Sequence, residues 1–137
     1  IPVYYGEEVA LDAMEIAAHV GKDFADCVAL HSQVTYQVYA VGFTLGFAYL
    51  GMLDPILSMP RKSTPRLRVP AGSLAIADRQ TAIYPRATPG GWHIIGRSNF
   101  ELADLSSDSL VQMQVGDQVS FTPISCDEFI AGGGELS

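Results

Sequence analysis

The sequence predicts a mainly β domain with two N-terminal helices. Three observations support this class: two helix-like segments precede residue 33, the apolar period changes to two from residue 34, and short strand-like segments alternate with turns after residue 70. Many short strands with a helical pair at one end are typical of a β-barrel or sandwich of the α+β kind. A chain of 137 residues suffices for one such domain and not for two.

The N-terminal part is predicted to hold a short strand and both helices. Residues 2–5 are typical of a strand that enters the domain. Residues 8–20 carry apolar side chains at helical spacing, and Gly21 ends that pattern. Asp23 is expected to cap a second, shorter helix that runs to about residue 30. The spaced apolar residues are Val9, Ala13, Ile16, Ala17 and Val20.

Strands are predicted from residue 34 onward. Residues 34–41 alternate β-branched and aromatic side chains with a period of two. Residues 42–70 have no clear hydrophobic period and form a segment longer than an ordinary connection. Such long loops usually bind a ligand or are disordered, and the aromatic residues of this segment argue against disorder. Further short strands are expected over 73–77, 81–84 and 92–96, with a hairpin-like pair over 110–115 and 118–124 around Gly116 and Asp117.

Charge and composition restrict the function. The net charge of −7 argues against a nucleic-acid partner. Seven of the eight basic residues nevertheless lie in one segment. Such a segment could bind a small anion or an acidic partner surface, or its charges could simply be solvated in loops. Charge alone does not decide between these alternatives. These residues are Arg61, Lys62, Arg66, Arg68, Arg79, Arg86 and Arg97.

Several classes find no support in the sequence. No apolar run reaches the length of a bilayer span, and no leader precedes the domain, so we expect a cytoplasmic protein without membrane contact. Cys27 and Cys126 are isolated, as expected for thiols in a reducing compartment, and no metal-binding motif is found. No glycine-rich nucleotide loop is found either. Because the first residue is Ile1, we expect a fragment whose N-terminal neighbour is missing.

Two histidines are candidates for a site. His31 closes the second predicted helix directly before the first long strand; it is either a helix C-terminal residue or the best candidate for a general base. His93 alternates with Trp92 on a predicted strand and therefore points away from it, to the surface or into a groove.

The segment YPRATPGGWHIIGR, residues 84–97, predicts a shaped binding surface. Pro85 and Pro89 fix φ, whereas Gly90 and Gly91 permit close backbone approach, so exposed N–H groups there could bind an anionic or carbonyl oxygen. The alternative is a loop-rich barrel whose turns simply need these residues. Candidate site residues are Arg61, Arg66 and Arg86 as donors, Gln80 and Tyr84 as neutral groups, Phe43, Phe47 and Tyr49 as an aromatic wall, and Trp92 and His93 beside the turn.

Three segments carry a resemblance to a known family: LHSQVTYQVYAVGFTLGFAYLGMLD, PRKSTPRLRVPAGSLAIADRQTAIYPRATPGGWHIIGR and VGDQVSFTPI. They resemble the C-terminal domain of the allophanate hydrolase subunit 1 family, which also contains a sporulation-kinase inhibitor and the B-subunit of 5-oxoprolinase. The resemblance implies a cyclophilin-like β-barrel over residues 1–130, normally preceded by a smaller α/β domain. Residues 131–137 are expected to form a flexible tail.

The resemblance also implies a function. It suggests a subunit of an ATP-dependent hydrolase that opens an amide, with 5-oxoproline preferred over allophanate. The site would be shared with a barrel partner, either the subunit 2 type or the 5-oxoprolinase C-subunit type, and a third subunit is possible. ATP would be used by the complex without being clearly bound by this chain. The alternative is a protein-binding module that inhibits a sensor histidine kinase.

Particular roles follow from that implied function. The guanidinium groups of Arg61, Arg66 and Arg86 and the Gly90–Gly91 backbone would bind anionic groups. Gln80 and Tyr84 would orient the substrate, and His31 would transfer a proton. Two departures from the family pattern stand out. Leu45 replaces a proline, and Asp78-Arg79 replaces a glycine pair, so side chains now occupy a turn that the family keeps bare.

Overall fold

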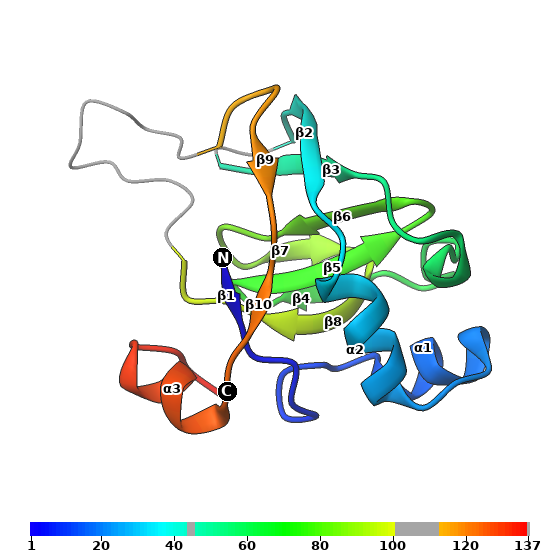
Figure 1. Ribbon diagram of the computed structural model, residues 1–137, viewed down its shortest axis with the longest axis horizontal. Helices are drawn as coiled ribbons and strands as arrows, with labels where there is room; N and C mark the ends of the chain where they lie inside the picture. Colours follow the sequence, from blue (N-terminus) through cyan, green and yellow to red (C-terminus); the bar gives the residue numbers. More distant parts are fainter. Residues whose placement is uncertain (44–45, 101–112, 137) are drawn as a thin grey trace.

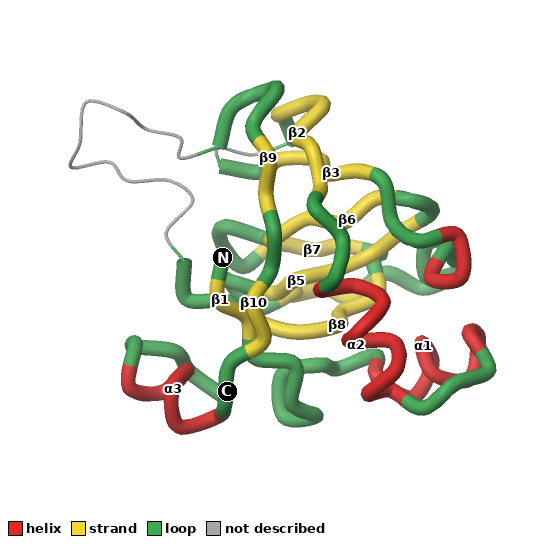
Figure 2. Tube along the Cα trace, viewed as in Figure 1, coloured by secondary structure: helices red, strands yellow, loops and turns green. Residues whose placement is uncertain are grey.

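The computed structural model describes residues 1–43, 46–100 and 113–136 (Figure 1). Strands occupy its centre and helices its periphery, which confirms the mainly β class with two N-terminal helices (Figure 2). The helices are α1 (Ala13–Val20), α2 (Phe24–Ser32), α3 (Cys126–Ala131) and the 3-10 turn η1 (Pro55–Leu57). The strands are β1 (Pro2–Val3), β2 (Tyr36–Val41), β3 (Ala48–Gly51), β4 (Arg66–Val69), β5 (Ser73–Ala77), β6 (Gln80–Ile83), β7 (Thr88–Gly90), β8 (His93–Arg97), β9 (Gln118–Val119) and β10 (Thr122–Pro123).

The described strands form three sheets. Six strands follow one another in the order β8-β5-β6-β3-β2-β9, while β4 pairs with β7 and β1 pairs with β10 in separate two-stranded ribbons. The described sheets do not close into the expected barrel. Arg97 of β8 forms an isolated bridge with Tyr4, and no ladder continues from β8 into the β1–β10 ribbon among the described strands.

The two faces of the six-stranded sheet pack differently. Leu74 and Ile76 of β5 lie in the larger core cluster, whereas Ala75 and Ala77 lie in a smaller one on the opposite face, as the period of two requires. Helices α1 and α2 lie side by side at one end of the sheet and cover the larger cluster (Figure 1). The smaller cluster contains no described helix residue, and it forms the floor of the candidate site.

The helix boundaries follow local hydrogen bonding. Helix α1 begins five residues later than expected because residues 7–12 form turns, in which the N–H groups of Val9 and Ala10 bond to the Gly6 carbonyl. Its predicted end is confirmed, since Gly21 adopts a left-handed φ of 75°. Helix α2 begins directly after Asp23, as expected.

The C-terminal region differs most from expectation. Sequence analysis missed α3, which is fixed by a reciprocal capping box between Ser125 and Glu128. In the expected late hairpin, residues 110–112 lie outside the described part, and residues 113–117 form a loop and turn rather than a strand. Strand β9 pairs with β2 instead.

A buried carboxylate joins α1 to the loop before β4 and to β8. The side chain of Asp12 is 2% exposed and accepts hydrogen bonds from Arg66 Nη1 (2.6 Å), Arg66 Nη2 (2.9 Å), Lys62 Nζ (3.0 Å) and the Ile94 N–H (2.7 Å). Burial alone would raise the pKa of Asp12, but the bonds from Arg66, Ile94 and Lys62 outweigh it and hold the pKa below its ordinary value. Asp12 is therefore ionised in the folded protein near neutral pH.

We expect Asp12→Asn to lower the free energy of unfolding by about 3 kcal/mol at pH 7, because the substitution leaves Arg66 and Lys62 without their buried counter-charge. The pKa of Asp12 is depressed on folding, so its contribution is present above the unfolded pKa of about 4 and is lost as pH falls through the lower, folded value. Urea unfolding at pH 7 and at about pH 3 measures both effects.

The matched control is Asp26→Asn, which removes an exposed carboxylate from α2 and should change stability by less than about 0.5 kcal/mol. Equal stability of Asp12→Asn and the unmodified chain at pH 7 would contradict the assigned role.

Candidate functional site

A small pocket lies over the face of the sheet that the helices leave uncovered. Its volume is about 260 Å³, and eight of the thirteen candidate residues named from the sequence line it. It is the strongest candidate site because segments distant in the sequence converge there. The lining residues are Phe43, Phe47, Tyr49, Arg61, Tyr84, Pro89, Gly90, Gly91 and Trp92, and we call this cavity the aromatic pocket.

Aromatic rings form its walls, with Phe47 at the centre. The Phe47 ring centroid lies 5.0 Å from that of Tyr49, 5.4 Å from Tyr84 and 5.9 Å from Trp92, all in edge-to-face geometry. Phe43 meets Phe47 in the same way at 5.3 Å. Edge-to-face contacts of this kind hold rings in fixed orientations, so the pocket has a defined shape.

One cation lies at the rim. The guanidinium carbon of Arg61 is 6.0 Å from the ring centroid of Trp92, within the range of a cation–π contact, and the Arg61 side chain is exposed. A ligand in the pocket would therefore meet an apolar, flat-walled interior and a positive charge at the opening.

Gly90 makes room for the phenol of Tyr84. A Cβ atom on Gly90 would lie 2.4 Å from Tyr84 Oη, whereas a Cβ on Gly91 would come no closer than 3.7 Å to any atom outside its chain neighbours. Tyr84 is 2% exposed, and burial raises the pKa of its hydroxyl. The first glycine of the Gly90-Gly91 pair is thus required by packing inside the pocket, and the neutral phenol beside it can donate or accept a hydrogen bond.

Gln80 and His93 lie elsewhere. Gln80 lines a separate cavity of about 540 Å³ with Tyr39 and Met52, and His93 lines one of about 640 Å³ beside α1. His93 Nε2 lies 3.1 Å from a carboxylate oxygen of Glu15, and burial lowers the pKa of His93. The expectation that His93 points away from Trp92 is met, since the two residues line different cavities.

Arg66 and Arg86 are not in the aromatic pocket. Both terminal nitrogens of Arg66 donate to Asp12, so the Arg66 guanidinium group is already paired within the protein. Arg86 is exposed in the loop between β6 and β7 and lines neither the aromatic pocket nor the cavities around Gln80 and His93. Of the three arginines proposed as anion donors, Arg61 alone reaches the aromatic pocket.

His31 is fully buried and hydrogen-bonded on both sides. The Thr81 hydroxyl donates to the Ala75 carbonyl (2.9 Å) and so accepts from His31 Nε2–H (3.0 Å), which leaves Nδ1 to accept from the Tyr5 hydroxyl (2.9 Å). Burial lowers the pKa of His31 to about 3, so the ring is neutral near pH 7. These contacts favour a structural role for His31 over proton transfer.

Sequence reasoning missed the polar group around Asp12. Lys62 bridges Asp12 and Glu15, and its backbone N–H bonds to the Gly91 carbonyl at 2.7 Å. These contacts fix the segment that carries Arg61 against the turn that carries Gly91. No local pattern identifies them, because the bonded residues are about fifty positions apart.

Two further observations concern the described part of the chain as a whole. It contains no helix with the length and apolar character needed to cross a membrane. Within the same residues, no three histidine, cysteine or acidic side chains gather as they would around a metal ion.

The comparison with protein families identifies the chain. The family model for the carboxyltransferase domain, subdomains C and D, matches residues 1–113. The chain belongs to this family. Relatives include the 5-oxoprolinase B-subunit of Escherichia coli, which is 46% identical over 90% of the chain, and that of Bacillus subtilis, which is 38% identical over 96%. The chain spans 56% and 55% of those two proteins, about half of their length.

Solved structures agree with the fold. A conserved uncharacterized protein of Pyrococcus horikoshii is 43% identical, with a TM-score of 0.89 over 94% of this chain and 60% of its own. The urea amidolyase of Kluyveromyces lactis has a TM-score of 0.77 at 18% identity, over 95% of this chain and 10% of its own, and at that identity it supports the fold alone.

The two departures from the family pattern have different outcomes. Leu45 lies outside the described residues. Asp78 has a positive φ of 52°, the conformation that glycine adopts without strain, and its N–H bonds to the Met59 carbonyl. Arg79 donates twice to the Leu53 carbonyl. The side chain of Arg79 thus stabilises the turn through the Leu53 carbonyl. Asp78 occupies the left-handed position of that turn.

We expect Gly90→Ala to destabilise the fold by about 1–3 kcal/mol, because the new methyl group overlaps Tyr84 Oη. Gly91→Ala is the matched control and should change stability by less than about 1 kcal/mol. Combining Gly90→Ala with Tyr84→Phe should recover part of the loss, which a double-mutant cycle from urea unfolding measures. Equal stabilities of the two alanine variants would contradict this account of the pocket.

Proposed function

We propose that this chain is the pocket-bearing part of a 5-oxoprolinase subunit, in which the aromatic pocket holds 5-oxoproline. The observation that carries the proposal is the pocket itself, whose aromatic walls and single rim cation match the substrate in size and charge. The names of the curated relatives support the reaction class. The substrate and the composite site are part of the proposal.

The chemistry of 5-oxoproline fits the two regions of the pocket. Its five-membered ring presents two flat faces, which pack against Trp92 and Phe47, and its carboxylate reaches the guanidinium of Arg61 at the rim. The phenol of Tyr84 and the peptide groups of Gly90 and Gly91 provide hydrogen bonds for the lactam amide. We assign Arg66 to the fold rather than to the substrate, because Asp12 occupies both of its terminal nitrogens.

ATP and the remaining catalytic groups are assigned to the complex. The sequence contains no glycine-rich nucleotide-binding motif, so we propose that the nucleotide binds outside this chain, elsewhere in the complex. The partner would be a barrel, either the subunit 2 type or the C-subunit type, that covers the open side of the pocket, and a third subunit would complete the enzyme. The chain alone would then bind substrate without turning it over.

Docking on a sensor histidine kinase is a second candidate. One observation favours it: Phe43, at the rim of the pocket, is 66% exposed, and exposed aromatic side chains are frequent in protein-binding surfaces. Aromatic walls also accept a proline ring. In a binding titration, saturation by a proline-containing peptide and no response to 5-oxoproline would support this candidate and overturn the first.

We expect 5-oxoproline to change the fluorescence of Trp92, the chain's single tryptophan, in a saturable way. Arg61→Gln should weaken binding by about tenfold, the effect of losing one charge-assisted hydrogen bond of about 1.5 kcal/mol. 2-Pyrrolidinone, which lacks the carboxylate, should bind about as weakly to the unmodified chain. Lys22→Gln, which removes an exposed cation at the end of α1, serves as the matched control. An unchanged affinity in Arg61→Gln would remove Arg61 from the site.

We expect the full-length protein to hydrolyse ATP in response to 5-oxoproline only when its partner subunits are present. Phosphate release measures this turnover, with each subunit assayed alone and in combination. Arg61→Gln should lower kcat/KM of the reconstituted enzyme by about tenfold, because it removes substrate binding. Turnover by this protein alone would refute the shared site, and full activity of Arg61→Gln would refute the assignment of the pocket.

A further inference from the structure

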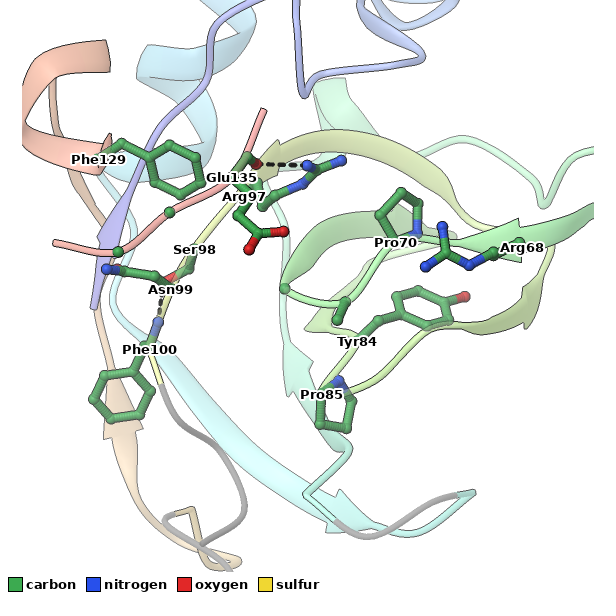
Figure 3. Close-up of a pocket in the computed structure, with 14 residues that line it drawn as sticks. Arg68, Pro70, Tyr84, Pro85, Arg97, Ser98, Asn99, Phe100, Phe129 and Glu135 are labelled. Atoms are coloured by element: carbon green, nitrogen blue, oxygen red, sulfur yellow. Dashed lines mark hydrogen bonds between the residues drawn. The ribbon is translucent and has the colours of Figure 1, made fainter. Parts of the chain in front are cut away.

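A second pocket lies beside the C-terminal tail, at the end of β8. It has a volume of about 360 Å³, within the range of small-molecule sites. It combines four parts of the chain: β4 with the turn before β5, the residues after β6, the end of β8 with the residues after it, and α3 with the tail (Figure 3). We call it the tail pocket. It is separate from the aromatic pocket, and Tyr84 is the one residue that lines both.

Three charged side chains line the tail pocket, and two of them, Arg68 and Glu135, are exposed. The third, Arg97, is buried and donates to the Glu135 carbonyl. Arg68 lies on one side, beside Pro70 and Tyr84, and Glu135 of the tail lies on the other, with its carboxylate directed into the pocket (Figure 3). Neither Arg68 nor Glu135 forms an ion pair with another described residue, and the Glu135 charge partly offsets the lowering of the Arg97 pKa by burial. The exposed charges of Arg68 and Glu135 are therefore available to a ligand.

Hydrogen bonds connect the backbone of the tail to neighbouring segments. Arg97 Nη1 donates to the Glu135 carbonyl at 2.7 Å, and the Gly134 N–H bonds to the Phe129 carbonyl at 2.8 Å. The side chain of Asn99 also donates to the Gly132 carbonyl. These three bonds place the Glu135 carboxylate at the pocket without using its oxygens.

Apolar side chains and the backbone of Gly72 form the rest of the lining. Pro70, Pro85 and Phe100 contribute apolar surface. Gly72 has a φ of 83°, and a Cβ there would lie 2.3 Å from the Ser98 carbonyl oxygen, so glycine permits the close approach of these two backbone segments at the pocket. The interior can therefore accept an uncharged, apolar group beside the two charged groups of a ligand.

We propose that the tail pocket binds a small amino acid with an apolar side chain as its zwitterion, with the carboxylate on Arg68 and the ammonium group on Glu135. A simple carboxylate would meet the like charge of Glu135, and a simple amine would meet that of Arg68, so only a ligand with both charges gains from both groups. The proposal does not depend on 5-oxoproline binding, because Arg61 and Trp92 are not part of this pocket.

Isothermal titration of the chain with L-leucine tests the proposal. We expect saturable binding with a Kd on the order of a millimolar or tighter. N-acetyl-L-leucine lacks the ammonium group and L-leucinamide lacks the carboxylate, so each should bind at least about tenfold more weakly. In NMR spectra, L-leucine should shift the amide signals of Gly72, Gly133 and Gly134, which line the pocket.

Two surface variants separate the charges. Arg68→Gln and Glu135→Gln should each weaken L-leucine binding by about tenfold, and Glu135→Gln should abolish the preference for L-leucine over N-acetyl-L-leucine. Lys22→Gln and Glu7→Gln, which change exposed charges outside the pocket, are the matched controls and should leave the affinity unchanged. Both site residues are exposed, so the folded state is expected to persist, and thermal unfolding checks it.

Three outcomes would overturn the proposal. They are the absence of saturable L-leucine binding, equal binding of N-acetyl-L-leucine, and unchanged affinity in either Arg68→Gln or Glu135→Gln. None of them bears on the aromatic pocket, which is probed through Arg61 and 5-oxoproline.

Discussion

The buried carboxylate of Asp12 determines where the rest of the candidate site lies. An ion that is 2% exposed is costly unless it is fully compensated, and here two cationic side chains and one backbone N–H compensate it. Those donors come from the loop before β4, from β4 itself and from β8. The same contacts therefore hold the segment that carries Arg61 against the strand that follows Trp92. Arg66 serves this structural purpose, and the rim of the aromatic pocket is left with Arg61 as its cation.

Successive side chains along β8 point to opposite faces of the sheet and therefore enter two different environments. Trp92 and Ile94 belong to the smaller cluster under the aromatic pocket, whereas Ile95 belongs to the core that the helices cover and His93 meets Glu15 of α1. Polar and ionic groups accordingly gather on the helical side, and aromatic rings gather on the other. A pocket with few charges results although the surrounding segment holds seven of the chain's eight basic residues. Charge density along the sequence is thus a poor guide to charge density in this pocket.

Sequence patterns predicted those features that depend on local geometry. The strand predicted over residues 73–77 coincides with β5, and Gly21 located the end of α1. The aromatic and glycine residues of the candidate wall do meet in one cavity. The patterns did not identify pairings between distant residues, such as Arg66 with Asp12 across 54 positions. The buried site of His31 depends on Tyr5 and Thr81, which lie 26 and 50 positions away in the sequence, and no local pattern encodes such contacts. Helix α3 was missed because the three glycines that follow it resemble a frayed end.

Phe43 shows why the fold alone does not account for the aromatic pocket. Its φ of 64° places a bulky side chain in the left-handed region, at a cost of about 1–2 kcal/mol. Its ring is 66% exposed, so burial does not offset that cost, and the edge contact with Phe47 recovers about 1 kcal/mol at most. A glycine would adopt this φ without strain and would expose no apolar ring. Because backbone strain of this kind accumulates at functional sites, the conformation of Phe43 supports the proposal that the aromatic pocket is a functional site whose rim meets a ligand or a partner surface.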